Sequence, residues 1–505
     1  MKKLLVLIVL ALFLSACAKD TSQISQNGPA PAENTSTGNP NNPNNPNNAS
    51  IDAANPISNQ TSQDDGGQLE TVYWGVLDVF KISNKAKADI SAYLKRNGMD
   101  FAIKFVELDT GNHGKAIKDY AAAGRQLDII YAGFADYEGF ALDLLADGKL
   151  DKLDDFLLEN PDIKAQFPEA LWKSVTYGDS VYAIPSWLSY GAVDYAFNPS
   201  KFGSEIDEFT ASESDLLDLY SRESTTIAMC VGSSEILPCN ELYGIGFPHD
   251  GEAPVNTFAR YSEILKLMNK RSAEGSLTHI TDIAPSYTRL FDVYIRSMWA
   301  RDSISIPDGY VTKRVKSHPQ PHFMGLAVLS GGNADRAKAL LQKVYADPEL
   351  ANLLIYGSNG TDYALKDGFA YNPDGTWRNA FGNSFALGRS FYKGLLPTQD
   401  ESLFYPQDVP DPIKYFEENM SISPYMGFIP QRNGREIGEI ERIAQARSTA
   451  IEQLVAYQTD PETGERHIIA ADKWLEETMK ELEDAGFGEW LESVTKQYED
   501  WKKSK

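Results

Sequence analysis

The sequence predicts an α/β protein of two lobes, carried on a leader and an unstructured tether. Short apolar strands alternate with amphipathic helices after residue 70, and the composition changes abruptly near residue 68. The 505-residue chain is also longer than one hydrophobic core usually serves. A βαβαβ order with apolar strands predicts a parallel sheet covered by helices.

The chain begins with a leader. Two lysines precede an apolar run over residues 4–14, which is too short to span a bilayer and has the length of a signal-peptide core. The run ends in Leu-Ser-Ala-Cys17, the pattern of a bacterial lipobox; an ordinary secretory signal with a chance cysteine is the alternative. We predict that residues 1–16 are a lipoprotein signal peptide. Cys17 then carries the lipid that holds the chain to the outer face of the cell membrane.

Residues 17–68 are predicted to be a disordered tether. They are rich in Asn, Pro, Ser, Thr and Gln, with a near-repeat of Asn and Pro over residues 39–46. Such a segment cannot bury enough apolar surface to offset its chain entropy. A coil of ~50 residues reaches roughly 35–45 Å, enough for an anchored domain to reorient.

Charge and cysteine content restrict the possible partners. The net charge of −24 argues against nucleic acid, because no basic surface is available to neutralise phosphates. Cys230 and Cys239 lie in one loop-like stretch that is predicted to fold outside the reducing cytosol. We predict a local disulfide between them, with two buried thiols as the alternative.

The first globular stretch supplies the alternating elements. Strands are predicted over residues 71–74, 101–106 and 127–132, and helices over residues 84–96 and 115–123. In the first helix one face is apolar, formed by Ala86, Ile90, Tyr93 and Leu94. Ligands bind such sheets beyond the carboxyl ends of the strands. That rule places Trp74 and the segment 134–137 on one rim.

Several later motifs resemble those of family 1 extracellular solute-binding proteins. Residues 181–185, Val-Tyr-Ala-Ile-Pro, follow a Gly-Asp turn and lead into a strand that ends in Phe197-Asn-Pro, which resembles the first crossing between lobes in that family. Residues 321–328 resemble the return crossing. The segments 353–363, 381–385 and 423–428 are similar to those of its Gram-positive lipoprotein branch, of the carbohydrate ABC importer type. Residues 209–256 have no counterpart in this pattern and are interpreted as an insertion on the second lobe.

The resemblance implies a two-lobed, periplasmic-binding-protein-like fold of the class II type, with a ligand cleft between the lobes. The N-terminal lobe would comprise residues 69–188 and 328–400, and the C-terminal lobe residues 189–327 and 401–505. It implies a monomeric importer subunit that delivers a sugar or oligosaccharide to ABC permease subunits, with no cofactor. A peptide- or polyamine-binding subunit on the same fold is the alternative.

Candidate ligand-binding residues follow from the chemistry of sugars. Aromatic rings cover the apolar faces of a sugar, while Asp, Asn and Arg side chains bond its hydroxyls. The candidates, each of which could instead be a packing or capping residue, are Trp74, Asp136, Tyr137, Trp187, Tyr190, Trp299, Asn359, Asp362, Trp377, Asn383 and Tyr425. Trp490, Leu491, Val494, Tyr498 and Trp501 recur at helical spacing and are predicted to be the buried face of the last helix. Trp474, Leu475, Met479 and Leu482 are predicted to form a similar face one helix earlier.

An enzyme is disfavoured. The chain lacks a Gly-x-Ser-x-Gly elbow, a His-Glu-x-x-His zinc helix and a phosphate-binding Gly-Lys-Ser/Thr loop. A secreted lipoprotein glycoside hydrolase remains the less favoured alternative, since it needs only two well-placed carboxylates. His318 and His322 are separated by two prolines that prevent helical presentation, so no metal site is predicted.

Overall fold

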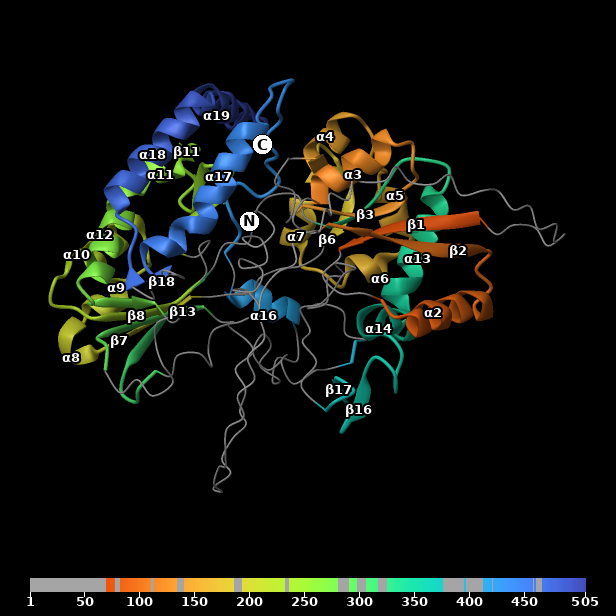
Figure 1. Ribbon diagram of the computed structural model, residues 1–505, viewed down its shortest axis with the longest axis horizontal. Helices are drawn as coiled ribbons and strands as arrows, with labels where there is room; N and C mark the ends of the chain where they lie inside the picture. The colour runs from red at the N-terminus through yellow and green to blue at the C-terminus, as the bar shows by residue number, and fades with distance from the viewer. Residues whose placement is uncertain are drawn as a thin grey trace, which may run out of the picture. The chain divides into compact units, whose positions relative to one another are not determined.

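Two mixed β-sheets organise the part of the chain that the structure describes. The computed structural model describes residues 70–77, 82–109, 113–133, 140–185, 193–231, 236–279, 290–297, 306–316, 325–375, 395–396, 412–419, 421–456, 458–459 and 466–505 (Figure 1). Each sheet has its own hydrophobic core. Each core is formed by residues from several stretches that are far apart in the sequence.

The first sheet has the order β2 (Phe101–Leu108), β1 (Glu70–Leu77), β3 (Ile129–Ala132), β15 (Gly325–Val328) and β6 (Ala183–Pro185). The first three strands are parallel, as the βαβαβ pattern predicts, and β15 runs antiparallel to both of its neighbours. β1 extends to Leu77, so the strand predicted to end at Trp74 is longer than expected.

Helices cover both faces of this sheet. In Figure 1, α3 and α4 lie on one side of β1 and β2, and α2 and α14 lie on the other. The elements around this sheet are α2 (Asn84–Arg96), α3 (His113–Ala122), α4 (Phe140–Ala146), α5 (Asp154–Glu159), α6 (Pro161–Lys164), α7 (Glu169–Ser174), α13 (Ala334–Ala346) and α14 (Pro348–Tyr356), with the hairpins β4 (Thr176–Tyr177)–β5 (Ser180–Val181) and β16 (Ala364–Lys366)–β17 (Phe369–Tyr371).

The sequence accounts for α2 in detail. Its bounds match the predicted helix, and its buried residues are the four of the predicted apolar face, Ala86, Ile90, Tyr93 and Leu94. Ser83 is the N-cap, and its Oγ accepts a hydrogen bond from the Ala86 amide at 3.0 Å. This bond satisfies one of the amides that a helix leaves unpaired at its start.

The second sheet repeats the arrangement of the first. Its order is β12 (Leu277–His279), β8 (Ile227–Cys230), β13 (Val293–Ser297), β7 (Val193–Phe197) and β14 (Val311–Val315). β12, β8 and β13 are parallel, while β7 runs antiparallel to β13 and β14. In both sheets the antiparallel fourth strand is the one that enters directly from the other lobe. β8 lies inside residues 209–256, so that stretch is not simply an insertion.

Helices pack on one face of the second sheet. The remaining elements are α8 (Pro199–Phe202), α9 (Glu205–Glu208), α10 (Glu213–Ser221), α11 (Thr257–Arg260), α12 (Ser262–Ala273), α16 (Pro412–Asn419), α17 (Gly438–Ala450), η6 (Ile451–Leu454), α18 (Ala471–Asp484) and α19 (Phe487–Ser504), a small sheet of β9 (Cys239–Leu242), β10 (Ile245–Pro248) and β11 (Val255–Asn256), and the hairpin β18 (Gln458–Thr459)–β19 (Arg466–His467).

The C-terminal helices follow the predicted periodicity with one exception. Trp490, Val494 and Tyr498 of α19 are buried, as predicted, while Leu491 and Trp501 are partly buried against the same core. In α18 the residues Trp474, Leu475 and Leu482 are buried too, but Met479 is 37% exposed, so its assignment to the buried face was wrong.

The chain returns to the first core late in the sequence. Ile413 packs against the first core and Ile429 belongs to it, although the predicted boundaries assign residues 401–505 to the second lobe. Phe428 and Ile437, on either side of Ile429, belong to the second core. The return crossing is complete by Gly325, where β15 begins, and not at residue 328. The third crossing between the lobes, predicted at residues 400–401, therefore lies later in the chain, between Ile413 and Ile437.

The predicted disulfide is absent, and strand geometry explains why. Successive side chains of a strand point to opposite faces of its sheet. In β8, Ile227 and Met229 face the large helical core, whereas Cys230 packs with Ala196 and Tyr294 on the other face. Cys239 lies in the helical core. The structure therefore shows two buried, separate thiols.

Both cysteines are expected to resist alkylation in the folded protein and to react once it is denatured. Burial, and then the charge of Glu241, raises the pKa of the Cys239 thiol, which keeps it protonated and unreactive. Mass spectrometry after alkylation without reductant, with and without denaturant, would measure this. A peptide pair joined by a disulfide would contradict it.

Candidate functional site

The candidate site lies at the edge of each sheet where the parallel strands end. In the first sheet β1, β3 and β6 end at this edge, at Leu77, Ala132 and Pro185, and β15 begins there at Gly325. A Cβ on Gly325 would lie 2.5 Å from the carbonyl oxygen of Ile184, so this close strand approach requires glycine. Open α/β sheets bind ligands beyond such an edge.

Several sequence candidates follow these strand ends in the chain but lie outside the described residues. Asp136 and Tyr137 come after β3, Trp187 and Tyr190 come between β6 and β7, and Trp299 comes after β13. The other candidates outside the described ranges are Trp377, Asn383 and the lipidation residue Cys17. Their assignment to the ligand site or to the anchor stays a prediction.

Trp74 is a correction to the sequence analysis. Its side chain is fully buried, and the ring packs against Phe105 with a centroid separation of 6.4 Å. The residue pairs with Phe105 on one side and Ile129 on the other, in the middle of β1. Because β1 continues to Leu77, Trp74 belongs to the core and not to the rim.

Tyr425 is a second correction. It is fully buried in the core of the second lobe, where its ring lies 4.7 Å from that of Tyr498 and 5.0 Å from that of Phe247. Its hydroxyl donates to the carbonyl oxygen of Glu252. Burial raises the pKa of this phenol, and the nearby Tyr498 adds to the effect. These contacts make Tyr425 a packing residue.

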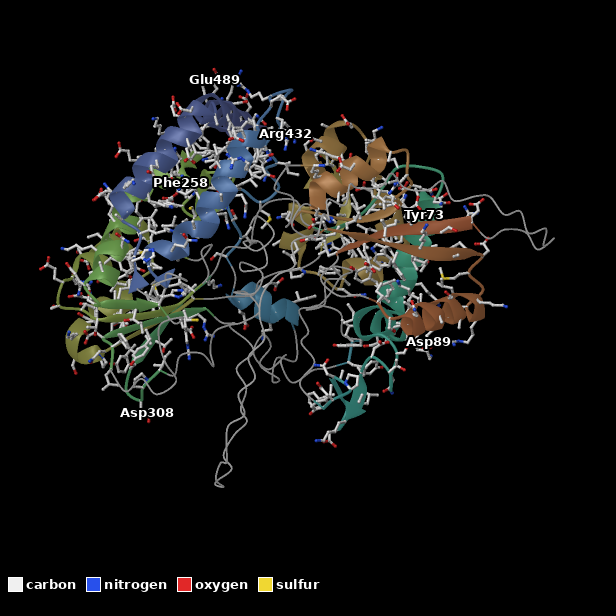
Figure 2. All side chains as sticks on the ribbon, viewed as in Figure 1. Tyr73, Asp89, Phe258, Asp308, Arg432 and Glu489 are labelled. Atoms are coloured by element: carbon white, nitrogen blue, oxygen red, sulfur yellow. The ribbon has the colours of Figure 1, made fainter. Side chains whose placement is uncertain are left out.

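Asn359 and Asp362 lie in a turn beside the start of α2. Asp362 Oδ2 accepts hydrogen bonds from Ser83 Oγ and from the Ser358 amide, each at 2.8 Å, so its carboxylate holds the turn against the helix. Ser358 Oγ in turn donates to Asp89, a residue of α2 labelled in Figure 2. Asn359 is exposed and stays available as a ligand contact, whereas Asp362 has the capping role that the sequence left as its alternative.

A cross-strand row of charged side chains at the edge of the second sheet was missed by sequence reasoning. Arg296 of β13, Asp194 of β7 and Arg314 of β14 occupy one register line, which continues to Cys230 of β8. Arg314 Nε lies 2.8 Å from Asp194 Oδ1 and its second terminal nitrogen lies 3.3 Å from Oδ2, a bidentate pair. Arg296 approaches the same carboxylate at 3.7 Å.

Aromatic rings lie behind this row on the same face of the sheet. Tyr294, with its ring 5.8 Å from Phe291 and 5.4 Å from Tyr310, packs beside Ala196 and Ala228. Tyr310 donates to the Phe291 carbonyl oxygen at 2.5 Å, and burial raises the pKa of its phenol. Figure 2 shows Asp308, from the turn before β14, and Phe258, from the helical layer, on opposite sides of this sheet. Rings and guanidinium groups thus share the face opposite the helices.

No group of three or more His, Cys, Asp or Glu side chains that could hold a metal ion occurs within the described ranges. His318 and His322 lie outside those ranges.

Replacing Trp74 by alanine is expected to lower the free energy of unfolding by about 3–5 kcal/mol, because it leaves a large cavity in the first core. Leu158→Ala is the control, since that side chain is 81% exposed and its loss should change stability by less than about 0.5 kcal/mol. Urea denaturation of both variants would measure the difference. A stable Trp74→Ala protein would mean that the ring is not a core residue.

The chain is similar to known binding proteins along most of its length. It matches no protein-family model. It is 22% identical over 439 residues to a carbohydrate ABC transporter substrate-binding protein of Streptococcus pneumoniae, covering 79% of this chain and 84% of that protein.

The fold of the chain is similar to that of solved structures of solute-binding proteins. The crystal structure of the N-glycan transport solute-binding protein of Streptococcus pneumoniae matches with a TM-score of 0.51 and 20% identity, covering 85% of this chain and 98% of the other. The structure of that protein in complex with Man1GlcNAc matches with a TM-score of 0.50 and 19% identity, covering 85% and 99%. With its two sheets of matching strand order, this chain has the two-lobed α/β fold of solute-binding proteins.

Proposed function

We propose that this protein is the substrate-binding subunit of an ABC importer, which captures a sugar or oligosaccharide and delivers it to membrane permease subunits. The observation that carries the proposal is the similarity to a carbohydrate ABC transporter substrate-binding protein over 84% of that protein's length. The protein would bind its ligand without chemical turnover. A ligand that touches both lobes favours a closed form by its higher affinity for that form.

The second sheet supplies side chains suited to a sugar. Arg314 is 38% exposed in its side chain and offers N–H donors to hydroxyl oxygens. The preference for a carbohydrate over a peptide or a polyamine rests on the similarity to that carbohydrate-binding relative.

A sugar ligand is expected to raise the melting temperature of the domain that begins at about residue 68. A ligand at about 100-fold its dissociation constant stabilises by ~2.7 kcal/mol, which gives a shift of a few degrees. The measurement is a thermal melt against oligosaccharides, peptides and polyamines, with product analysis of the glycan. A shift with peptides alone would overturn the carbohydrate assignment, and cleavage of the glycan would indicate a hydrolase.

Trp187→Ala in the same assay tests the predicted sugar platform. Tyr177→Ala is the matched control, because Tyr177 lies in the β4–β5 hairpin of the first lobe and is 36% exposed. The sugar-induced shift should shrink in the first variant and persist in the second.

Lipid attachment at Cys17 is the proposed means of localisation. Within the described ranges, no helix has the length and apolarity that crossing a membrane requires. Diacylglyceryl modification would supply two acyl chains, and stable anchoring takes more than one.

Cys17→Ser is therefore expected to release the protein from the membrane fraction. Fractionation of cells that express the wild type and the variant, followed by immunoblotting, measures the distribution. A variant that remains with the membranes would show a second attachment.

A further inference from the structure

The sequence contains four Asn-Gly pairs, and three of them lie within the described residues: Asn97–Gly98, Asn359–Gly360 and Asn433–Gly434. Both residues of each of these three pairs are exposed to solvent. In such a pair the backbone nitrogen of the glycine can attack the side-chain amide carbon of the asparagine. Glycine permits this approach better than other residues, because it has no Cβ to obstruct the nitrogen. The three pairs therefore have the same intrinsic chemistry, and only their surroundings distinguish them.

Hydrogen bonds hold the glycine amides of the first two pairs. The Gly98 amide donates to the Lys95 carbonyl oxygen at 3.2 Å. The Gly360 amide donates to the Tyr363 carbonyl oxygen at 2.7 Å. Attack by either nitrogen on the neighbouring asparagine must first break its hydrogen bond, so both bonds slow the reaction.

The Asn433–Gly434 pair lies in a different kind of turn. It forms the centre of a β-turn that is closed by a 3.1 Å hydrogen bond from the Arg435 amide to the Arg432 carbonyl oxygen. The φ angles of 54° at Asn433 and 77° at Gly434 are typical of a type I′ turn, in which the amide of the second central residue takes no part in the closing bond. Within the part of the chain that the structure describes, the Gly434 amide donates to no other residue.

We propose that Asn433 is a site of spontaneous deamidation. The Gly434 nitrogen bonds to the side-chain carbonyl carbon of Asn433, and the bond from that carbon to the side-chain nitrogen breaks. The Gly434 amide proton passes through water to the departing nitrogen, which leaves as ammonia, and a succinimide ring remains. Water then opens the ring at either of its two carbonyl carbons. One product is an aspartyl residue, and the other is an isoaspartyl residue, in which the backbone runs through the former side chain.

The modification changes the third crossing between the lobes. The turn lies between Ile429 of the first core and Ile437 of the second. Deamidation creates a negative charge on the residue that follows Arg432, whose terminal nitrogens lie 2.6 Å from Glu441 Oε1 and 3.6 Å from Asp143 Oδ2. The new carboxylate would compete with these two for the guanidinium. The isoaspartyl product also adds one carbon to the backbone of the crossing.

The test is to incubate the full chain in mildly alkaline buffer and to follow each asparagine by peptide mapping and mass spectrometry. Cleavage after glutamate releases residues 419–436 as one peptide, and fragmentation distinguishes Asn433 from Asn419. In the folded protein, Asn433 should deamidate about threefold to tenfold faster than Asn359, the factor that one hydrogen bond accounts for. Asn97 should be slower still, because its side-chain nitrogen also donates to the Tyr93 carbonyl oxygen at 3.0 Å.

A denatured sample and one variant are the controls. In denaturant the asparagines of the three pairs should deamidate at similar rates, because the hydrogen bonds at Gly98 and Gly360 are lost. Asn433→Gln should abolish the reaction at this position and leave the rates at Asn97 and Asn359 unchanged, since the longer side chain must close a less favourable six-membered ring. A thermal melt establishes that the variant is folded.

The rates and the products decide the inference. A faster rate at Asn433 in the folded protein, with isoaspartate among its products, would support it. Equal rates at the three asparagines of the folded protein, or a faster rate at Asn97 or Asn359, would overturn it. Aspartate without isoaspartate at Asn433 would also overturn it, because direct hydrolysis of the side-chain amide forms no ring.

Discussion

The return of the chain from the second lobe as strand β15 is the constraint on which the first sheet depends. β15 lies between β3 and β6 in the first sheet, and β7 lies between β13 and β14 in the second. Each of these strands follows a crossing from the other lobe and runs antiparallel to its neighbours. The first sheet is complete only when the chain has passed through the second lobe and returned as β15, whereas all five strands of the second sheet lie within residues 193–315. Neither core is encoded by one continuous stretch of sequence, since the second core also takes residues from Tyr425 to Tyr498. At Gly325, the first residue of β15, the neighbouring strand β6 lies too close to admit a Cβ atom.

Local periodicity predicted the parts of the structure that depend on neighbouring residues. The apolar face of α2 and the buried stripe of α19 follow from helical spacing alone, and the order of the first three strands follows from their alternation with helices. The prediction that Trp74 contacts the ligand was wrong because β1 was expected to end at Trp74. The strand continues to Leu77, so Trp74 lies in its middle. The predicted disulfide between Cys230 and Cys239 was wrong because proximity in sequence does not determine which face of a sheet a side chain occupies.

The charged row at the edge of the second sheet could not have been found in the same way. Asp194, Arg296 and Arg314 come from three strands that are far apart in sequence, and only the strand register brings them together. The one local signal was a carboxylate within the otherwise apolar strand that follows the first crossing. A buried acid in such a strand requires a partner. The sequence does not say which of the 47 lysines and arginines supplies it.

Ile429 has a mechanical consequence. A single linker between two bodies permits rotation about several axes, including free swivelling of one body on the other. Here β6 and β14 are each followed in the chain by a strand of the other sheet, β7 and β15 respectively. A further connection lies at Ile429, which belongs to the first core while its neighbour Phe428 is buried in the second. Three connections restrict the rotation of one lobe against the other more than a single linker would.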